Sequence, residues 1–213
     1  MEAPTSAIFD QKAAHYDAWF ESERGQALFA SEVQCLRKLT EGLPRPWLEV
    51  GVGTGRFAEA LDIEFGLDPA RGALLYAKGR SIQVLEGVGQ RLPFQDDSFG
   101  AVFTTVTICF ADDPEGLLRE AARVTQPAGR VVLGIVPAGS AWGRFYAEKA
   151  RAGHPFYAHA TFYSLAELED LARRAGLAFV RCVATLQRGP EDECLDVEAP
   201  REGCCEADGF VAI

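Results

Sequence analysis

The sequence predicts an α/β fold with a mostly parallel sheet. Residues 47–50 form a short apolar strand, and a turn with three glycines and a helical pattern follow it directly. Four further strand patterns alternate with helical ones, at residues 63–67, 81–85, 100–105 and 131–136. Strands that alternate with helices are typical of parallel sheets covered on both faces. At 213 residues the chain is long enough for one domain with a sizeable core.

The glycine turn indicates a ligand site. Gly51, Gly53 and Gly55 stand at alternating positions after Glu49. Such a loop lets a ligand approach the main chain, and the helix N-terminus behind it offers unpaired N–H groups. Dinucleotide-binding proteins use G-x-G-x-x-G around a pyrophosphate, which the Glu49 charge would repel. The pattern therefore favours a cationic ligand, and a turn that only connects strand and helix remains the alternative.

Two segments resemble class I S-adenosylmethionine-dependent methyltransferases. E-V-G-V-G-T-G at residues 49–55 is similar to the family's nucleotide loop, E/D-x-G-x-G-x-G. Residues 87–99 resemble G-D-A-x-x-L-P-F…D-x-S-F in the small type-11 subgroup related to ubiquinone and menaquinone biosynthesis. The resemblance covers about residues 45–137. It implies a Rossmann-like, seven-stranded sheet of order 3-2-1-4-5-7-6, with strand 7 antiparallel and helices on both faces.

The resemblance also implies which residues bind S-adenosyl-L-methionine. Asp68 stands where relatives hold the ribose hydroxyls, although Asp at a strand-to-helix junction is also a good helix N-cap. Two positions depart from the pattern, because Val88 replaces the acidic residue near adenine and Gly100 replaces the Asp of S-F-D. The expected cofactor-binding set is Glu49, Gly51, Val52, Gly53, Asp68, Pro69, Val88, Gly89, Gln90, Thr105 and Val106.

The flanking segments predict where a substrate binds. Residues 9–20 form an amphipathic helix that either packs its aromatic stripe on the domain or covers the cofactor as a lid. As a lid, it would bring His15, Tyr16 and Asp17 near the substrate. We expect one methyltransferase domain over residues 1–213. Its parts are an N-terminal helical lid (1–44), a cofactor-binding core (45–137), an aromatic substrate cover (138–176) and C-terminal hairpin strands (177–213).

The C-terminal third carries a helix start and a long polar loop. Ser164 and Glu167 form a capping box that opens a helix. Residues 179–186 are the expected sixth strand, and residues 209–213 an antiparallel seventh beside it. The acidic segment 188–208 between them is expected to be a solvated loop.

A general base is needed only if the methyl acceptor arrives protonated. The candidates are His15, Cys109, His154 and His159, and the residues do not single one out. Cys109 has a second interpretation as a small buried hydrophobe. Cys194, Cys204 and Cys205 invite a metal or thiol interpretation, but adjacent cysteines seldom ligate one zinc and no His lies nearby. No metal site is expected.

The bulk composition restricts the partners. A formal net charge of −10 and a pI of about 4.8 disfavour nucleic acid. No apolar run could cross a bilayer, and residues 1–10 lack the pattern of a signal peptide. The six cysteines show no disulfide-framework spacing, which favours a reducing cytoplasm. We expect a cytoplasmic monomer or homodimer that uses a small-molecule substrate.

These observations predict methyl transfer from S-adenosylmethionine to a small-molecule acceptor. One alternative is a module that binds the cofactor as a sensor or partner without transferring methyl. An NAD(P)-dependent oxidoreductase is a second alternative, which the glycine spacing disfavours.

Overall fold

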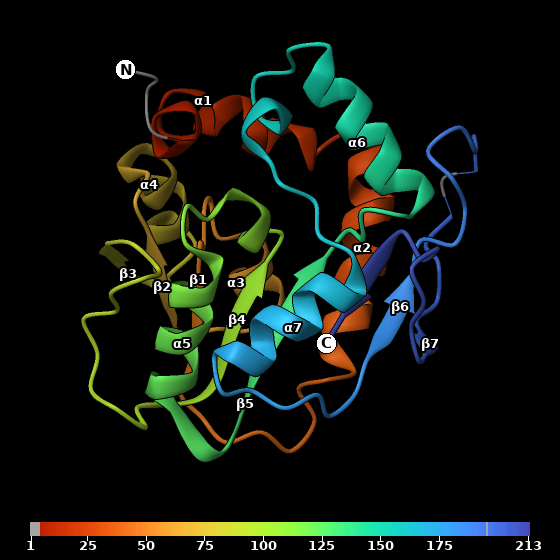
Figure 1. Ribbon diagram of the computed structural model, residues 1–213. Coiled ribbons are helices and arrows are strands. Elements are labelled where there is room, and N and C mark those ends of the chain that lie inside the picture. The colour runs from red at the N-terminus through yellow and green to blue at the C-terminus, as the bar shows by residue number, and fades with distance from the viewer. Residues whose placement is uncertain (1–4, 195) are drawn as a thin grey trace.

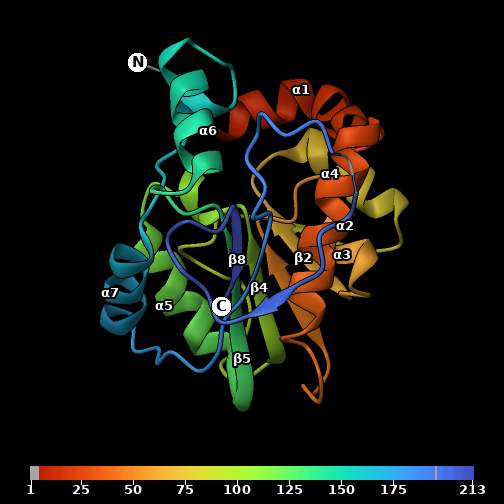
Figure 2. The same ribbon diagram turned by 90° about the vertical axis from the view of Figure 1, so that its right-hand side faces the viewer.

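The computed structural model describes residues 5–194 and 196–213. Residues 1–4 of the expected lid and of the segment tested for a signal peptide lie outside this range. The strands form one eight-stranded sheet of order β3-β2-β1-β4-β5-β8-β6-β7. Figures 1 and 2 show α5 and α7 on one face, and α2, α3 and α4 on the other. The expected α/β sheet is confirmed, with eight strands in place of seven.

The first five strands are parallel and the last three are antiparallel to their neighbours. The strands are β1 (Trp47–Val50), β2 (Phe65–Asp68), β3 (Gln83–Glu86), β4 (Phe99–Thr105), β5 (Thr125–Ile135), β6 (Val183–Thr185), β7 (Arg201–Glu202) and β8 (Phe210–Ala212). The helices are α1 (Thr5–Trp19), α2 (Glu23–Arg37), α3 (Arg56–Ala60), α4 (Arg71–Gly79), α5 (Pro114–Val124), α6 (Ala141–Arg151) and α7 (Leu165–Arg174), with 3-10 turns η1 (Ile108–Phe110) and η2 (Tyr157–His159).

Each face of the sheet has its own hydrophobic core. Successive side chains of a strand point to opposite faces, so Trp47 joins Leu36 and Phe103 on one side. Leu48 joins Leu118 on the other side. β1 and β4 are buried along their whole length. This double burial holds the end of β1, and the glycine turn that follows it, in a fixed place.

Local helix signals in the sequence agree with the structure. Asp113 is the N-cap of α5, and its Oδ1 accepts a hydrogen bond from the Gly116 N–H at 2.8 Å. Ser164 and Glu167 form the expected capping box of α7. Packing explains why residue 100 is a glycine, because a Cβ there would lie 1.8 Å from the Pro44 carbonyl oxygen. A side chain at this position, such as the Asp of the S-F-D pattern, would therefore clash with the Pro44 backbone.

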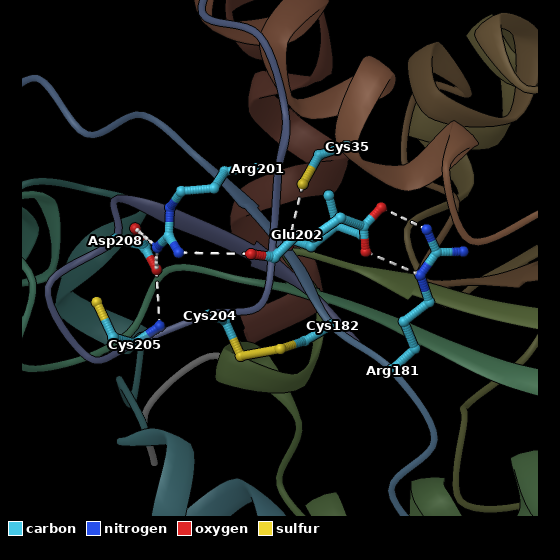
Figure 3. The surroundings of a disulfide bond; sticks show 9 residues. Cys35, Arg181, Cys182, Arg201, Glu202, Cys204, Cys205 and Asp208 are labelled. Atoms are coloured by element: carbon cyan, nitrogen blue, oxygen red, sulfur yellow. Dashed lines mark hydrogen bonds and ion pairs between the residues drawn. A yellow bond between two sulfur atoms is a disulfide. The ribbon is translucent and has the colours of Figure 1, made fainter.

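The C-terminal segment differs from the expectation in two ways. The expected sixth strand, residues 179–186, shortens to β6, and the segment expected to be only a loop contains β7. Cys182 and Cys204 form a disulfide with a Cα–Cα distance of 5.9 Å, which corrects the expectation of unpaired cysteines. Figure 3 shows it next to the ion pair of Arg181 with Glu202. The edge strand β7 is therefore attached to β6 by hydrogen bonds, charge and a covalent bond.

The described residues hold no helix of the length and apolarity that a bilayer span requires. Among the same residues, no group of three or more His, Cys, Asp or Glu side chains is placed to bind a metal ion.

Candidate active site

A cavity of about 270 Å³ opens at the carboxyl ends of β1, β2 and β4. Ligands of parallel α/β sheets bind in this position, where the strand order reverses. Figure 1 shows α1 lying above this edge of the sheet. The cavity brings together the whole expected cofactor-binding set, which comprises Glu49, Gly51, Val52, Gly53, Asp68, Pro69, Val88, Gly89, Gln90, Thr105 and Val106.

The glycine turn has a backbone that side chains rarely adopt. Gly51 and Gly53 have φ angles of +76° and +51°. A Cβ at Gly51 would lie 2.1 Å from Thr107, whereas a Cβ at Gly53 would meet nothing within 4 Å. The first glycine is required by packing on the loop after β4. The second leaves open space beside the main chain, where a ligand can approach it.

Asp68 connects the end of β2 to the glycine turn. Its Oδ2 accepts a hydrogen bond from the Gly53 N–H at 2.9 Å, and its Oδ1 accepts one from the Ala70 N–H at 2.7 Å. Burial raises the pKa of Asp68, and these two amides oppose the rise. The N-cap of α4 is Ala70, so Asp68 does not serve as the helix cap considered above. These two hydrogen bonds use only part of the acceptor capacity of the carboxylate, so further lone pairs remain free to face the cavity.

Three polar side-chain atoms that border the cavity are buried without a hydrogen-bond partner among the described residues: Glu49 Oε2, Thr54 Oγ1 and Thr105 Oγ1. Glu49 is 1% exposed, and burial raises its pKa to about 8. Buried polar groups in native proteins are nearly always paired. Val106, a β-branched residue with φ of 51°, adds backbone strain of the kind found at functional sites. The cavity is therefore built for a polar ligand.

Known proteins share this arrangement. Residues 48–133 match a family described as "Methyltransferase domain". An uncharacterised protein of Mycobacterium tuberculosis is 42% identical over 99% of this chain and 74% of its own length. A solved structure from Thermotoga maritima, a SAM-dependent methyltransferase named a possible histamine N-methyltransferase, is 37% identical, with a TM-score of 0.89 over 98% of this chain and 97% of that one. This chain belongs to the S-adenosylmethionine-dependent methyltransferases.

These matches confirm the resemblance to S-adenosylmethionine-dependent methyltransferases that the sequence motifs indicated. A demethylmenaquinone methyltransferase of Corynebacterium efficiens is 39% identical over 31% of this chain and 29% of its own length, as the L-P-F segment suggested. The family accounts for the fold and the class of reaction.

Helix α1 is fixed to the methyltransferase core by charge. The Asp17 carboxylate accepts hydrogen bonds from Arg56 at 2.9 and 2.7 Å and from Arg80 at 3.1 Å. Burial alone would raise the pKa of Asp17, but hydrogen bonds, with Arg56 foremost, lower it to about 2. The same helix places Phe9 and Tyr16 on the cavity, and Phe20, which directly follows the helix, also lines it. Asp17 thus holds the aromatic residues of α1 in position and does not itself line the cavity.

The four candidate bases lie in different environments. His15 and His159 are exposed, and neither lines the cavity. His154 stacks on Tyr157 with ring centroids 4.5 Å apart, and burial lowers its pKa. Burial raises the pKa of Cys109 to about 12, so that this thiol stays protonated at neutral pH. None of the four is among the residues that line the cavity.

The cavity also contains residues outside the expected cofactor-binding set. Phe9 and Phe110 line the cavity with ring centroids 5.0 Å apart, although they belong to separate elements. Thr54 and Thr107 line it from the two loops beside the glycines. The two threonines could have been found from their positions in the sequence, because each is adjacent to an expected cofactor-binding residue.

Proposed function

We propose that the methyltransferase binds S-adenosylmethionine in the cavity above β1, β2 and β4 and methylates a small molecule held under α1. The observation that carries the proposal is the buried Glu49 carboxylate, which has an unpaired oxygen beside a glycine turn. A positively charged, phosphate-free nucleoside supplies the missing partner. A diphosphate would oppose the ionisation of the Glu49 carboxyl group, whereas an ammonium favours it.

Several parts of the cofactor have residues suited to hold them. Glu49 faces the ammonium, whereas the amides of Gly51, Val52 and Gly53 already donate to protein oxygens. Asp68 accepts hydrogen bonds from the ribose hydroxyls. Gly89 and Gln90 present backbone groups to adenine, because Val88 has no side-chain acceptor to offer.

The bound cofactor supplies a methyl group already activated by a positively charged sulfur. The remaining work of the protein is to hold the acceptor in line and to exclude water. Thr105 and Val106 line the cavity at the end of β4, and the aromatic residues Phe9, Tyr16 and Phe110 line it as well.

The acceptor is a small molecule. The net charge of −10 disfavours polyanionic acceptors. The name of the Thermotoga relative places small amines such as histamine among the acceptors to test.

Isothermal titration calorimetry tests the cofactor. S-adenosylhomocysteine should bind, and NAD should give no heat. Gly53→Val should abolish binding because it fills the space beside the turn. Gly42→Val is the matched control, since Gly42 also has a positive φ of +76° and open space around it, but lies away from the cavity. Binding of NAD, or of neither ligand, contradicts the proposal. Release of labelled methyl groups to an acceptor then separates an enzyme from a sensor.

A further inference from the structure

One carboxylate binds both ends of a long segment above the sheet. The Gly139 N–H donates a hydrogen bond to Glu206 Oε1 at 2.7 Å, and the Leu165 N–H donates one to Glu206 Oε2 at 2.9 Å. The residues between these two amides carry α6 and η2 and belong to the expected substrate cover. We call residues 139–165 the α6–η2 segment. Glu206 therefore closes this segment at its base.

The charge of Glu206 suits its position, because two helices begin there. Gly139 directly precedes Ser140, the N-cap of α6, and Leu165 is the first residue of α7. Helix N-termini carry unpaired N–H groups and a partial positive charge, which an anion stabilises. A Cβ at Gly139 would lie 2.6 Å from Glu206 Cγ, so the glycine leaves room for the carboxylate. Glu206 thus attracts both helices by charge as well as by hydrogen bonds.

Glu206 is itself fixed to the sheet, in the short turn between β7 and β8. The Asp208 carboxylate closes this turn by accepting hydrogen bonds from the Cys205 N–H at 2.7 Å and from Arg201 in β7 at 2.8 Å (Figure 3). Cys204 lies in the same turn, and its disulfide attaches the turn to the residue before β6. A carboxylate on such a turn can hold the α6–η2 segment in place relative to the sheet.

The far part of the α6–η2 segment packs behind residues that line the cavity. The ring of Phe156 lies 5.1 Å from that of Phe9 and 5.8 Å from that of Tyr16, and both of these residues line the cavity. The Thr161 N–H donates a hydrogen bond to the Cys109 carbonyl oxygen at 2.7 Å, and Cys109 belongs to η1, whose last residue lines the cavity too. Figures 1 and 2 show α1 and α6 above the same edge of the sheet. The segment therefore supports the cavity from outside.

We infer that Glu206 is a positioning residue for methyl transfer, which fixes the ends of the α6–η2 segment and thereby holds Phe156 against the residues of α1 that line the cavity. This inference rests on the proposed function and adds a residue that acts on the cavity without touching it. Phe9 and Tyr16 can move away from a bound ligand only if Phe156 moves back, because close-packed side chains leave no free space behind them. When the segment is released at its base, that support is lost and the ligand leaves faster.

The first test measures the dissociation rate of S-adenosylhomocysteine by surface plasmon resonance. Glu206→Ala should raise this rate about tenfold. Glu206→Gln keeps one acceptor oxygen and should raise the rate less. Glu193→Ala removes an exposed charge from the loop that precedes β7 and should leave the rate unchanged. An unchanged rate in Glu206→Ala would overturn the inference.

The second test asks whether Glu206 acts through Phe156. Phe156→Ala should also raise the dissociation rate. Substitutions at independent sites have additive free energies, so that their effects on a rate multiply. If Glu206 acts by holding Phe156 in place, the double variant should release the ligand no faster than Phe156→Ala alone. A double variant whose rate is raised by the product of the two single effects would contradict the inference.

Hydrogen–deuterium exchange tests the same connection without a ligand. In Glu206→Ala, amide exchange should rise throughout residues 139–165, including the peptide that contains Phe156, and in α1, whereas β1 and β4 should keep their protection. A rise confined to the two ends of the α6–η2 segment would show that Glu206 only caps two helices, and the inference would be wrong. If Glu206→Ala does not fold, Glu206→Gln takes its place in each experiment.

The two levels of the account fail in different ways. If S-adenosylhomocysteine does not bind the wild type, the proposed function is wrong, and the exchange experiment still decides whether Glu206 holds Phe156 in place. If the ligand binds and leaves Glu206→Ala and Glu206→Gln at the wild-type rate, the cofactor site stands and the positioning role of Glu206 is refuted.

Discussion

Binding of S-adenosylhomocysteine should expel a proton from Glu49 at neutral pH. Burial raises the pKa of this carboxyl from 4.5 to about 8. At pH 7 a group with that pKa carries roughly 0.9 proton. An ammonium placed beside the carboxylate favours its charged form and lowers the pKa. Binding should therefore release close to one proton per protein molecule.

The same pKa shift connects Glu49 to stability. Because the folded-state pKa lies above the unfolded-state value, the group stabilises the fold fully below pH 4.5 and loses that contribution as pH rises through about 8. The linkage relation gives a loss of about 3 kcal/mol between about pH 4 and pH 7. Glu49→Gln cannot ionise, so its free energy of unfolding should lack this part of the pH dependence.

The assay for proton release is calorimetry at pH 7 in phosphate and in Tris, whose ionisation enthalpies differ. The difference between the two observed heats gives the number of protons released. Glu49→Gln should bind more weakly and show no such difference. Glu169→Gln removes an exposed charge on α7 and should behave as the wild type. Equal heats in the two buffers for the wild type would refute the reasoning.

Three further predictions concern contacts around the site and the C-terminal edge. Asp68→Ala should weaken S-adenosylhomocysteine binding by about 1 to 3 kcal/mol in calorimetry, and an unchanged affinity would count against a ribose contact. Asp17→Asn should lower the free energy of unfolding in urea at pH 7 by about 1 to 2 kcal/mol, because Arg56 and Arg80 each lose one of their two carboxylate partners. Since the Asp17 pKa is depressed to about 2, the difference from the wild type should fade as pH drops below 3.8 towards 2. A thiol titration of denatured, unreduced protein should find four free thiols, and six would contradict the disulfide. Cys182→Ser should lower the free energy of unfolding by about 3 kcal/mol.

The sequence was sufficient where the signal is local. Ser164 and the strand at residues 47–50 were assigned correctly, because helix caps and apolar strands depend on neighbouring residues. The glycine turn was also read correctly, since its positive φ angles require glycine. These local features were enough to predict the α/β class. They were also enough to predict a set of residues that all line one cavity.

The sequence was insufficient where distant segments meet. The bond between Cys182 and Cys204 spans 22 residues and has no local signature. The two-residue strand β7 forms only because β6 lies beside it. Gly100 could not be explained without seeing the Pro44 carbonyl against it. These features depend on tertiary packing.

The solvent exposure of individual side chains also could not be predicted from residue type. His15 and Tyr16 are adjacent in one helix, yet the first is exposed and the second lines the cavity.

The most direct test of the central claim is a crystal structure of the protein with S-adenosylhomocysteine. We predict density for the ligand in the cavity, with its ammonium next to Glu49, its ribose on Asp68 and its sulfur facing Tyr16. A ligand bound elsewhere, or one whose ammonium points away from Glu49, would contradict the account.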